Sequence, residues 1–245
     1  MNIDLNADIG EGLANDEDLM AFISSANIAC GGHAGHWQTM EKTVALCKKH
    51  RVAVGAHPSF FDRENFGRVE MGLPEEEIRK LIISQVTVFQ KVCNVAGVAI
   101  NHVKPHGALY NMSARDPALA RAIAETVYAI SPSLKLFGLS GSHSVEQGKK
   151  AGLTTVAEVF ADRAYREDGS LMPRNQPGAL VTSPQAAVGQ ALMLATEQRV
   201  RAANGQLIPL EAQSICLHGD GPHAVSFARN IYNTLSERGI LIQPV

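Results

Sequence analysis

The sequence has little of several features that mark particular classes of protein. Its 22 Lys and Arg residues nearly balance 24 Asp and Glu residues, for a formal net charge of -2. We find no basic cluster that resembles a phosphate-binding stripe, so we expect no nucleic-acid partner. No uninterrupted apolar run reaches the length of about 20 residues that a membrane-spanning helix needs, so we expect no membrane association.

Cysteines are few and unpaired in their spacing. The sequence contains four, at Cys30, Cys47, Cys93 and Cys216, and no two of them form a C-x-x-C pair. This spacing argues against a zinc knuckle or a redox dithiol and favours buried free thiols in a reducing compartment. The first residues also lack the basic start and apolar core of a signal peptide, so we expect a cytoplasmic protein.

What the sequence does contain is an ordinary globular composition, with 45% hydrophobic and 19% charged residues in a chain of 245 residues. No Pro- or Gly-rich linker divides it, so we expect a single domain spanning residues 1–245. Six short apolar runs each end in histidine, an acid or a basic residue: 3–8, 26–33, 52–57, 100–106, 156–163 and 214–220. Runs of this length predict buried strands, and reactive residues at strand exits are typical of an α/β barrel enzyme.

Segments with helical periodicity alternate with these strands. Pro74, Asp116-Pro117 and Ser183-Pro184 are helix start signals. We also expect shorter helices at 16–24, 37–50 and 144–151, a last helix at about 221–238, and further strands at 134–139 and 178–181. The alternation predicts parallel strands in seven βα units, with 240–242 as a terminal strand. The unstructured stretch 162–176 is expected to be a loop over the active site.

The first strand carries polar residues on one face. Strand alternation places Asp4, Asn6 and Asp8 together, which in a barrel is the interior near its mouth. Alternatively, Asp8 only caps the first turn. We favour a functional role for Asp8 and leave Asp4 and Glu11 open.

The second strand leads into an H-x-x-H pair, His33 and His36. Together with Asp8 the pair suggests a divalent metal, but this spacing is common by chance. Cys30 could be a nucleophile beside His33, although a buried structural thiol is the better interpretation.

Two further strand exits carry basic groups. His57 ends the third strand, where a lone histidine often only bonds a neighbouring carbonyl. In the fourth, His102, Lys104 and His106 share a face. A buried lysine needs anions nearby, so Lys104 either stabilises a substrate oxyanion or forms a structural ion pair. His106 is suited to proton transfer near neutral pH.

The last candidates surround the expected loop and the final strand exit. Glu158 lies in the sixth run, and Arg163 and Arg174 are suited to gripping a carboxylate or phosphate. Asp220 follows the last strong strand, where it either serves the site or is only the N-cap of the last helix.

The residues at these positions resemble the motifs of the LamB/YcsF family, the proteins that form the A subunit of 5-oxoprolinase. Seven stretches match in order: 4–11, 27–35, 55–59, 65–68, 102–111, 158–174 and 216–224. One departure is His36, where the family pattern places aspartate, so the H-x-x-H pair is poor support for a metal. Ala164 also stands where glycine is common. The motifs match at Asn6, Asp8, His33, His57, Lys104, His106, Glu158, Arg163, Arg174 and Asp220.

The resemblance implies a distorted (β/α)7 TIM-like barrel of the glycoside hydrolase and deacetylase type. It also implies ATP-dependent opening of 5-oxo-L-proline to L-glutamate, with Mg²⁺ carried by the nucleotide and with partner subunits B and C. The resemblance supports these positions as site residues but does not fix their individual roles. We expect Asp8, Lys104 and His106 to be catalytic and the other matched residues to bind substrate. We expect no tightly bound protein metal.

Two other functions remain open from the sequence. One is a metal-dependent amide or sugar deacetylase that uses Asp8, His33 and either His36 or His57. The other is a module without catalytic activity that binds 5-oxo-L-proline and presents it to partner subunits.

Overall fold

A closed barrel of parallel strands forms the centre of the molecule, in a computed structural model that describes residues 1–217 and 224–245. Seven strands close the barrel in the order β1-β2-β3-β4-β5-β6-β9, and β9 pairs again with β1. They are β1 (Asn2–Ile9), β2 (Ser25–Ala29), β3 (Ala53–His57), β4 (Ile100–Val103), β5 (Lys135–Leu139), β6 (Thr155–Phe160) and β9 (Ser214–Leu217). The predicted (β/α)7 TIM-like barrel is thereby confirmed.

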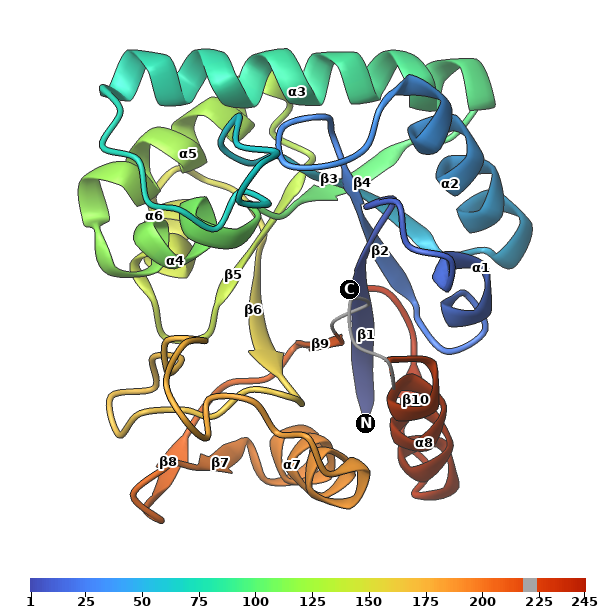
Figure 1. Ribbon diagram of the computed structural model, residues 1–245, viewed down its shortest axis with the longest axis vertical. Coiled ribbons are helices and arrows are strands. Elements are labelled where there is room, and N and C mark those ends of the chain that lie inside the picture. Colours follow the sequence, from blue (N-terminus) through green and yellow to red (C-terminus); the bar gives the residue numbers. More distant parts are fainter. Residues whose placement is uncertain (218–223) are drawn as a thin grey trace.

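Helices surround the strands, as Figure 1 shows. They are α1 (Asp16–Leu19), α2 (Trp37–His50), α3 (Glu75–Ala96), α4 (Gly107–Arg115), α5 (Pro117–Ile130), α6 (His143–Lys150), α7 (Pro184–Glu197) and α8 (Ala224–Glu237). The start signals act as expected, since Asp116 accepts hydrogen bonds from Ala118 and Leu119 amides and Ser183 accepts one from Ala186. No helix in the described ranges is both long and apolar enough to cross a membrane.

Two local expectations were wrong and two elements were not predicted. Residues 178–181 are not a strand, because only Leu180 pairs, in an isolated antiparallel bridge with Arg163. Helix α1 spans one turn only, and α4 was not predicted. A two-stranded antiparallel hairpin of β7 (Arg199–Arg201) and β8 (Leu207–Pro209) follows α7 and was also missed. The terminal strand is confirmed, since β10 (Leu241–Ile242) pairs with the start of β1.

The strand alternation separates an apolar layer from a polar barrel interior. Ile3, Leu5 and Ile9 of β1 belong to the hydrophobic core between strands and helices. The intervening Asp4 and Asn6 are equally buried, with no exposed surface. Buried polar groups are costly unless they are hydrogen-bonded, so the polar face requires partners from neighbouring strands.

Candidate active site

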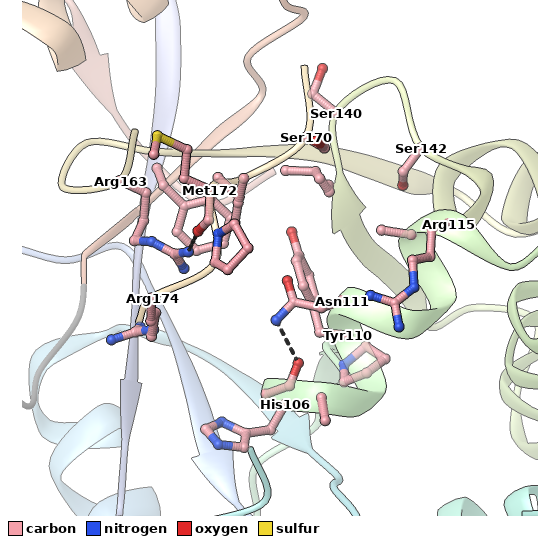
Figure 2. Close-up of a pocket in the computed structure, with 18 of the residues that line it drawn as sticks. His106, Tyr110, Asn111, Arg115, Ser140, Ser142, Arg163, Ser170, Met172 and Arg174 are labelled. Atoms are coloured by element: carbon pink, nitrogen blue, oxygen red, sulfur yellow. Dashed lines mark hydrogen bonds between the residues drawn. The ribbon is translucent and has the colours of Figure 1, made fainter. Parts of the chain in front are cut away.

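A cavity of about 930 Å³ opens at the carboxyl ends of the strands. Its lining includes Asp8, His57, Lys104 and His106 from strand exits, and Arg163 and Arg174 from the following loop. In Figure 2 the two arginines lie on one side of this space, with the loop that carries Met172, opposite Tyr110 and Asn111 of α4. The volume falls within the range of about 300–1,000 Å³ that is typical of small-molecule sites.

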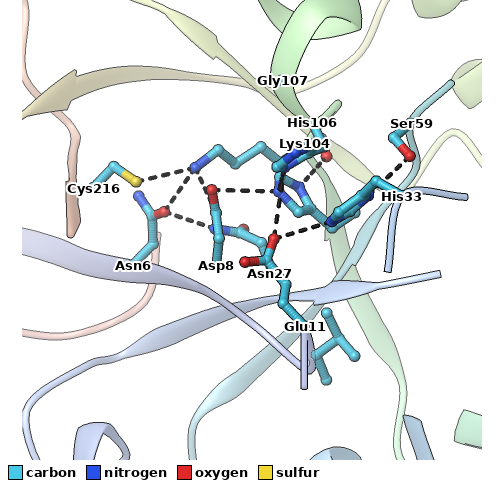
Figure 3. Close-up of polar contacts among 12 residues, drawn as sticks. Asn6, Asp8, Glu11, Asn27, His33, Ser59, Lys104, His106, Gly107 and Cys216 are labelled. Carbon is cyan, nitrogen blue, oxygen red and sulfur yellow. Dashed lines mark hydrogen bonds and ion pairs between the residues drawn. The ribbon is translucent and has the colours of Figure 1, made fainter. Parts of the chain in front are cut away.

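Lys104 lies at the centre of a charged network at the cavity floor (Figure 3). Its Nζ is 2.9 Å from Asp8 Oδ1 and 2.7 Å from Glu158 Oε1. It also donates to Asn6 Oδ1 at 3.3 Å and to Cys216 Sγ at 3.2 Å. Burial alone would lower the pKa of Lys104, but the neighbouring Asp8, Cys216 and Glu158 raise it well above its ordinary value. Lys104 is therefore a charged ammonium held between two carboxylates.

Asn27 of β2 connects this network to the next strands. Its amide donates to Asn6 Oδ1 at 2.7 Å and to Asp8 Oδ1 at 2.8 Å, and its own oxygen accepts from His102 at 2.7 Å. Because the Asn27 amide and the Lys104 ammonium both donate to Asp8 Oδ1, the Asp8 side chain has little freedom to rotate. The deeper Asp4 carboxylate accepts hydrogen bonds from three hydroxyls, those of Ser24, Ser25 and Ser214.

Three histidines meet beside Asp8. His57 Nε2 lies 3.3 Å from Asp8 Oδ2 and 2.9 Å from His106 Nδ1. The rings of His33 and His106 stack with centroids 3.6 Å apart, and His33 Nε2 contacts Glu11 Oε1 at 3.0 Å. Burial, followed by the neighbouring His57, lowers the pKa of His33 to about 3 and holds that of His106 well below its ordinary value. Both are neutral imidazoles at neutral pH.

The loop after β6 forms the arginine-bearing wall. Arg163 donates to the Met172 carbonyl at 2.6 Å, which folds the loop back on itself. Burial and the nearby Arg174 lower the pKa of Arg163 to about 10, so its guanidinium remains charged at neutral pH. Gln190 of α7 anchors the base of the loop, donating to the carbonyls of Phe160 and Arg163 at 2.8 Å each. The expectation that residues 162–176 cover the site agrees with this placement.

The structure brings most of the predicted residues together, but not all in the expected way. Asn6, His33 and Glu158 were expected to bind substrate, yet their side chains are buried in the supporting network. His36 is exposed and caps α2, accepting from the Thr39 amide, so it does not join His33 in a metal pair. Asp220 lies outside the described residues.

Sequence reasoning missed three contributors. Asn27 was seen as part of a strand, although strand alternation could have placed it on the interior face. The role of Glu11 was left open. The structure places Glu11 just after the end of β1, with its carboxylate against His33. Gln190 gave no signal, because a glutamine within a helix is ordinary.

Comparison with known proteins identifies the family of the chain. The LamB/YcsF family model matches residues 3–245. The chain belongs to the LamB/YcsF family. The A subunit of 5-oxoprolinase from Histophilus somni (strain 129Pt) is 49% identical over 240 residues, which cover 98% of this chain and 97% of that protein.

Solved structures give the same result for the fold. The lactam utilization protein from Thermus thermophilus superposes with a TM-score of 0.95 at 40% identity, covering 100% of both chains. The peptidoglycan deacetylase PdaC from Bacillus subtilis has a TM-score of 0.51 at 12% identity, covering 100% of this chain and 87% of that one. This second likeness is one of fold alone.

Proposed function

We propose that the chain is the A subunit of an ATP-dependent 5-oxoprolinase, a hydrolase that opens the lactam of 5-oxo-L-proline to give L-glutamate. The observation that carries the proposal is the 49% identity, over nearly the whole chain, to a protein named as the A subunit of 5-oxoprolinase. The cavity supports it, because its lining combines a fixed carboxylate, Asp8, with the cationic Arg163 and Arg174.

The chemistry explains the need for ATP. A lactam is stabilised by resonance, and transfer of the γ-phosphoryl group to its oxygen, with release of ADP, makes the ring carbon a stronger electrophile. Water adds to that carbon and loses a proton. The C–N bond then breaks as the ring nitrogen takes up a proton, leaving an acyl phosphate. A second water hydrolyses the acyl phosphate to carboxylate and phosphate.

In this proposal Asp8 is the base that accepts the proton of the attacking water. The His106 ring lies 2.9 Å from His57 and 3.0 Å from the Phe66 carbonyl, and these contacts fix its orientation in the site. Arg163 and Arg174 hold the substrate carboxylate and the phosphoryl oxygens. ATP brings Mg²⁺ on its phosphates.

The proposal includes partner subunits B and C, because the name of the relative implies a complex of several subunits. It places the reaction in the cytoplasm, in keeping with four cysteines that are all free and buried.

The test is glutamate formation from 5-oxo-L-proline by the assembled enzyme with Mg-ATP. Asp8→Asn keeps the size of the side chain but removes the base, so turnover should fall by about 10²–10⁴-fold. Asp18→Asn, in the exposed first turn of α1, is the matched control and should leave turnover unchanged. Turnover by Asp8→Asn at the control rate would refute the assignment.

A further inference from the structure

Two ring nitrogens of the histidine cluster face each other at short range, while the far nitrogen of each ring is held by a backbone carbonyl. His57 Nδ1 lies 2.7 Å from the Lys104 carbonyl, and His106 Nε2 lies 3.0 Å from the Phe66 carbonyl. A carbonyl only accepts, so each of these ring nitrogens donates a hydrogen to its carbonyl. The other nitrogens, His57 Nε2 and His106 Nδ1, face each other across 2.9 Å. Two imidazole nitrogens at this distance can both be ligands of one cation placed between them and the cavity.

Two carboxylates also lie close to these two facing nitrogens of His57 and His106. Glu11 Oε1 lies 3.7 Å from His106 Nδ1, and Asp8 Oδ2 lies 3.3 Å from His57 Nε2. One ligand atom from each of Glu11, His33, His57 and His106 lies within 4.8 Å of the others. Glu11, His57 and His106 also line the cavity, so this point is reached from the substrate side.

The backbone beside the cluster has unusual dihedral angles at Phe66 and Gly67, and the Phe66 carbonyl orients His106. Phe66 has a φ of 57°, which is rare for a bulky residue, and its carbonyl is the one that fixes His106. Gly67 follows with a φ of 64°, and an added Cβ there would lie 2.9 Å from His33 Cβ and 3.1 Å from His106 Cδ2. Strain of this kind persists where the surroundings fix it, and it concentrates at functional sites.

We propose that Glu11, His57 and His106 bind a divalent cation of the zinc class. Two imidazoles and one carboxylate form a set of zinc ligands that leaves a position open for water or substrate. His57 Nδ1 and His106 Nε2 donate to the carbonyls of Lys104 and Phe66. Metal-binding histidines normally have such a partner on the nitrogen that does not bind the metal. A tetrahedral ion with bonds of about 2.0–2.1 Å needs donor atoms roughly 3.3 Å apart, and the measured separations of 2.9 and 3.7 Å bracket that value.

Other residues of the cluster support the ion. His33 contacts Glu11 at 3.0 Å and stacks on His106, so it orients both of these ligands. Asp8 lies beside the open position. The ion is distinct from the Mg²⁺ that accompanies ATP. The inference therefore goes beyond the proposed function and replaces the sequence-based expectation of no tightly bound metal.

The experiment is zinc binding by the full chain, which needs no substrate or partner. The protein is stripped with a chelator, titrated with ZnCl₂ by calorimetry, and analysed for bound metal after dialysis. Co²⁺ in place of Zn²⁺ should give the visible absorption of a low-symmetry histidine site. We expect one zinc ion per wild-type chain.

Two variants and one control make the test specific to these residues. Glu11→Gln and His57→Asn should each lose stoichiometric binding, and circular dichroism checks that each is folded. Glu11→Gln keeps the side-chain shape, so it provides the answer if His57→Asn does not fold. His36→Asp, at the exposed cap of α2, should still bind one ion. Absence of saturable binding by the wild type, or equal binding by Glu11→Gln, would overturn the proposal.

Discussion

At the scale of single residues, Lys104 shows how a buried charge is balanced. The sequence left two roles for it, an oxyanion donor or a partner in an ion pair. The structure places its ammonium between Asp8 and Glu158, at 2.9 and 2.7 Å, so its charge is already balanced before substrate binds. Its main effect on the site is therefore to hold the Asp8 side chain in place.

Lys104→Met should consequently destabilise the protein. The change leaves the buried Glu158 carboxylate without its counter-charge, and breaking such a pair from one side costs about 3–5 kcal/mol. The free energy of unfolding, measured in urea, checks this value. Combining Lys104→Met with Glu158→Gln should restore part of the loss. A single variant as stable as the wild type would show that the ion pair does not stabilise the fold.

The sequence predicted well which polar residues face the barrel interior, wherever strand alternation and a family motif indicated the same residue. Asn6, Asp8, His57, Lys104 and His106 all face the barrel interior or its mouth, as expected. It could not distinguish lining residues from supporting ones, because burial of Glu158 depends on neighbours from β1 and β4. Nor could it find the contact between His57 and His106, since those residues are distant in sequence and their tautomers depend on backbone carbonyls.

At the scale of elements, the start of α4 positions the site. Gly107 has a φ of 55°, and an added Cβ would lie 2.5 Å from the Gly67 carbonyl oxygen. The close approach packs the loop before α3 onto the first turn of α4, directly after His106. Helix α4 was missed from sequence because a glycine at its first position reads as a turn.

Gly107→Ala should disturb both the element and the site. The side chain meets a backbone atom and adopts an unfavourable φ, which together should lower the free energy of unfolding by about 1–3 kcal/mol. Thermal and urea unfolding measure the loss. Gly72→Ala, in the loop before α3, is the control, because an added Cβ there has no described heavy atom within 4 Å. Equal stability of the two variants would contradict the packing argument.

At the scale of the whole molecule, the closed barrel keeps all four thiols away from solvent. Each cysteine is free and buried, and burial raises the pKa of Cys47 and Cys93 to about 12. The same effect raises the pKa of Cys30 and Cys216. Six of the seven barrel strands were predictable from the repeated apolar runs. The hairpin of β7 and β8 was not, because its strands are only three residues long.

The native protein should therefore react very slowly with a thiol reagent at neutral pH. A thiol with a raised pKa carries almost no thiolate, and thiolate is the reactive form. Four groups per chain should react once denaturant is added, as an absorbance assay with Ellman's reagent would record. Rapid modification of a cysteine in the folded protein would contradict the burial that the fold assigns to it.

The central claim is that this chain acts on 5-oxo-L-proline as one subunit of an ATP-driven hydrolase. The most direct measurement is glutamate release from 5-oxo-L-proline, by the chain alone and with its partner subunits B and C, in each case with and without Mg-ATP. We expect release only when the partners and Mg-ATP are both present. Hydrolysis by the isolated chain without ATP, or an assembled enzyme that releases no glutamate, would contradict the account.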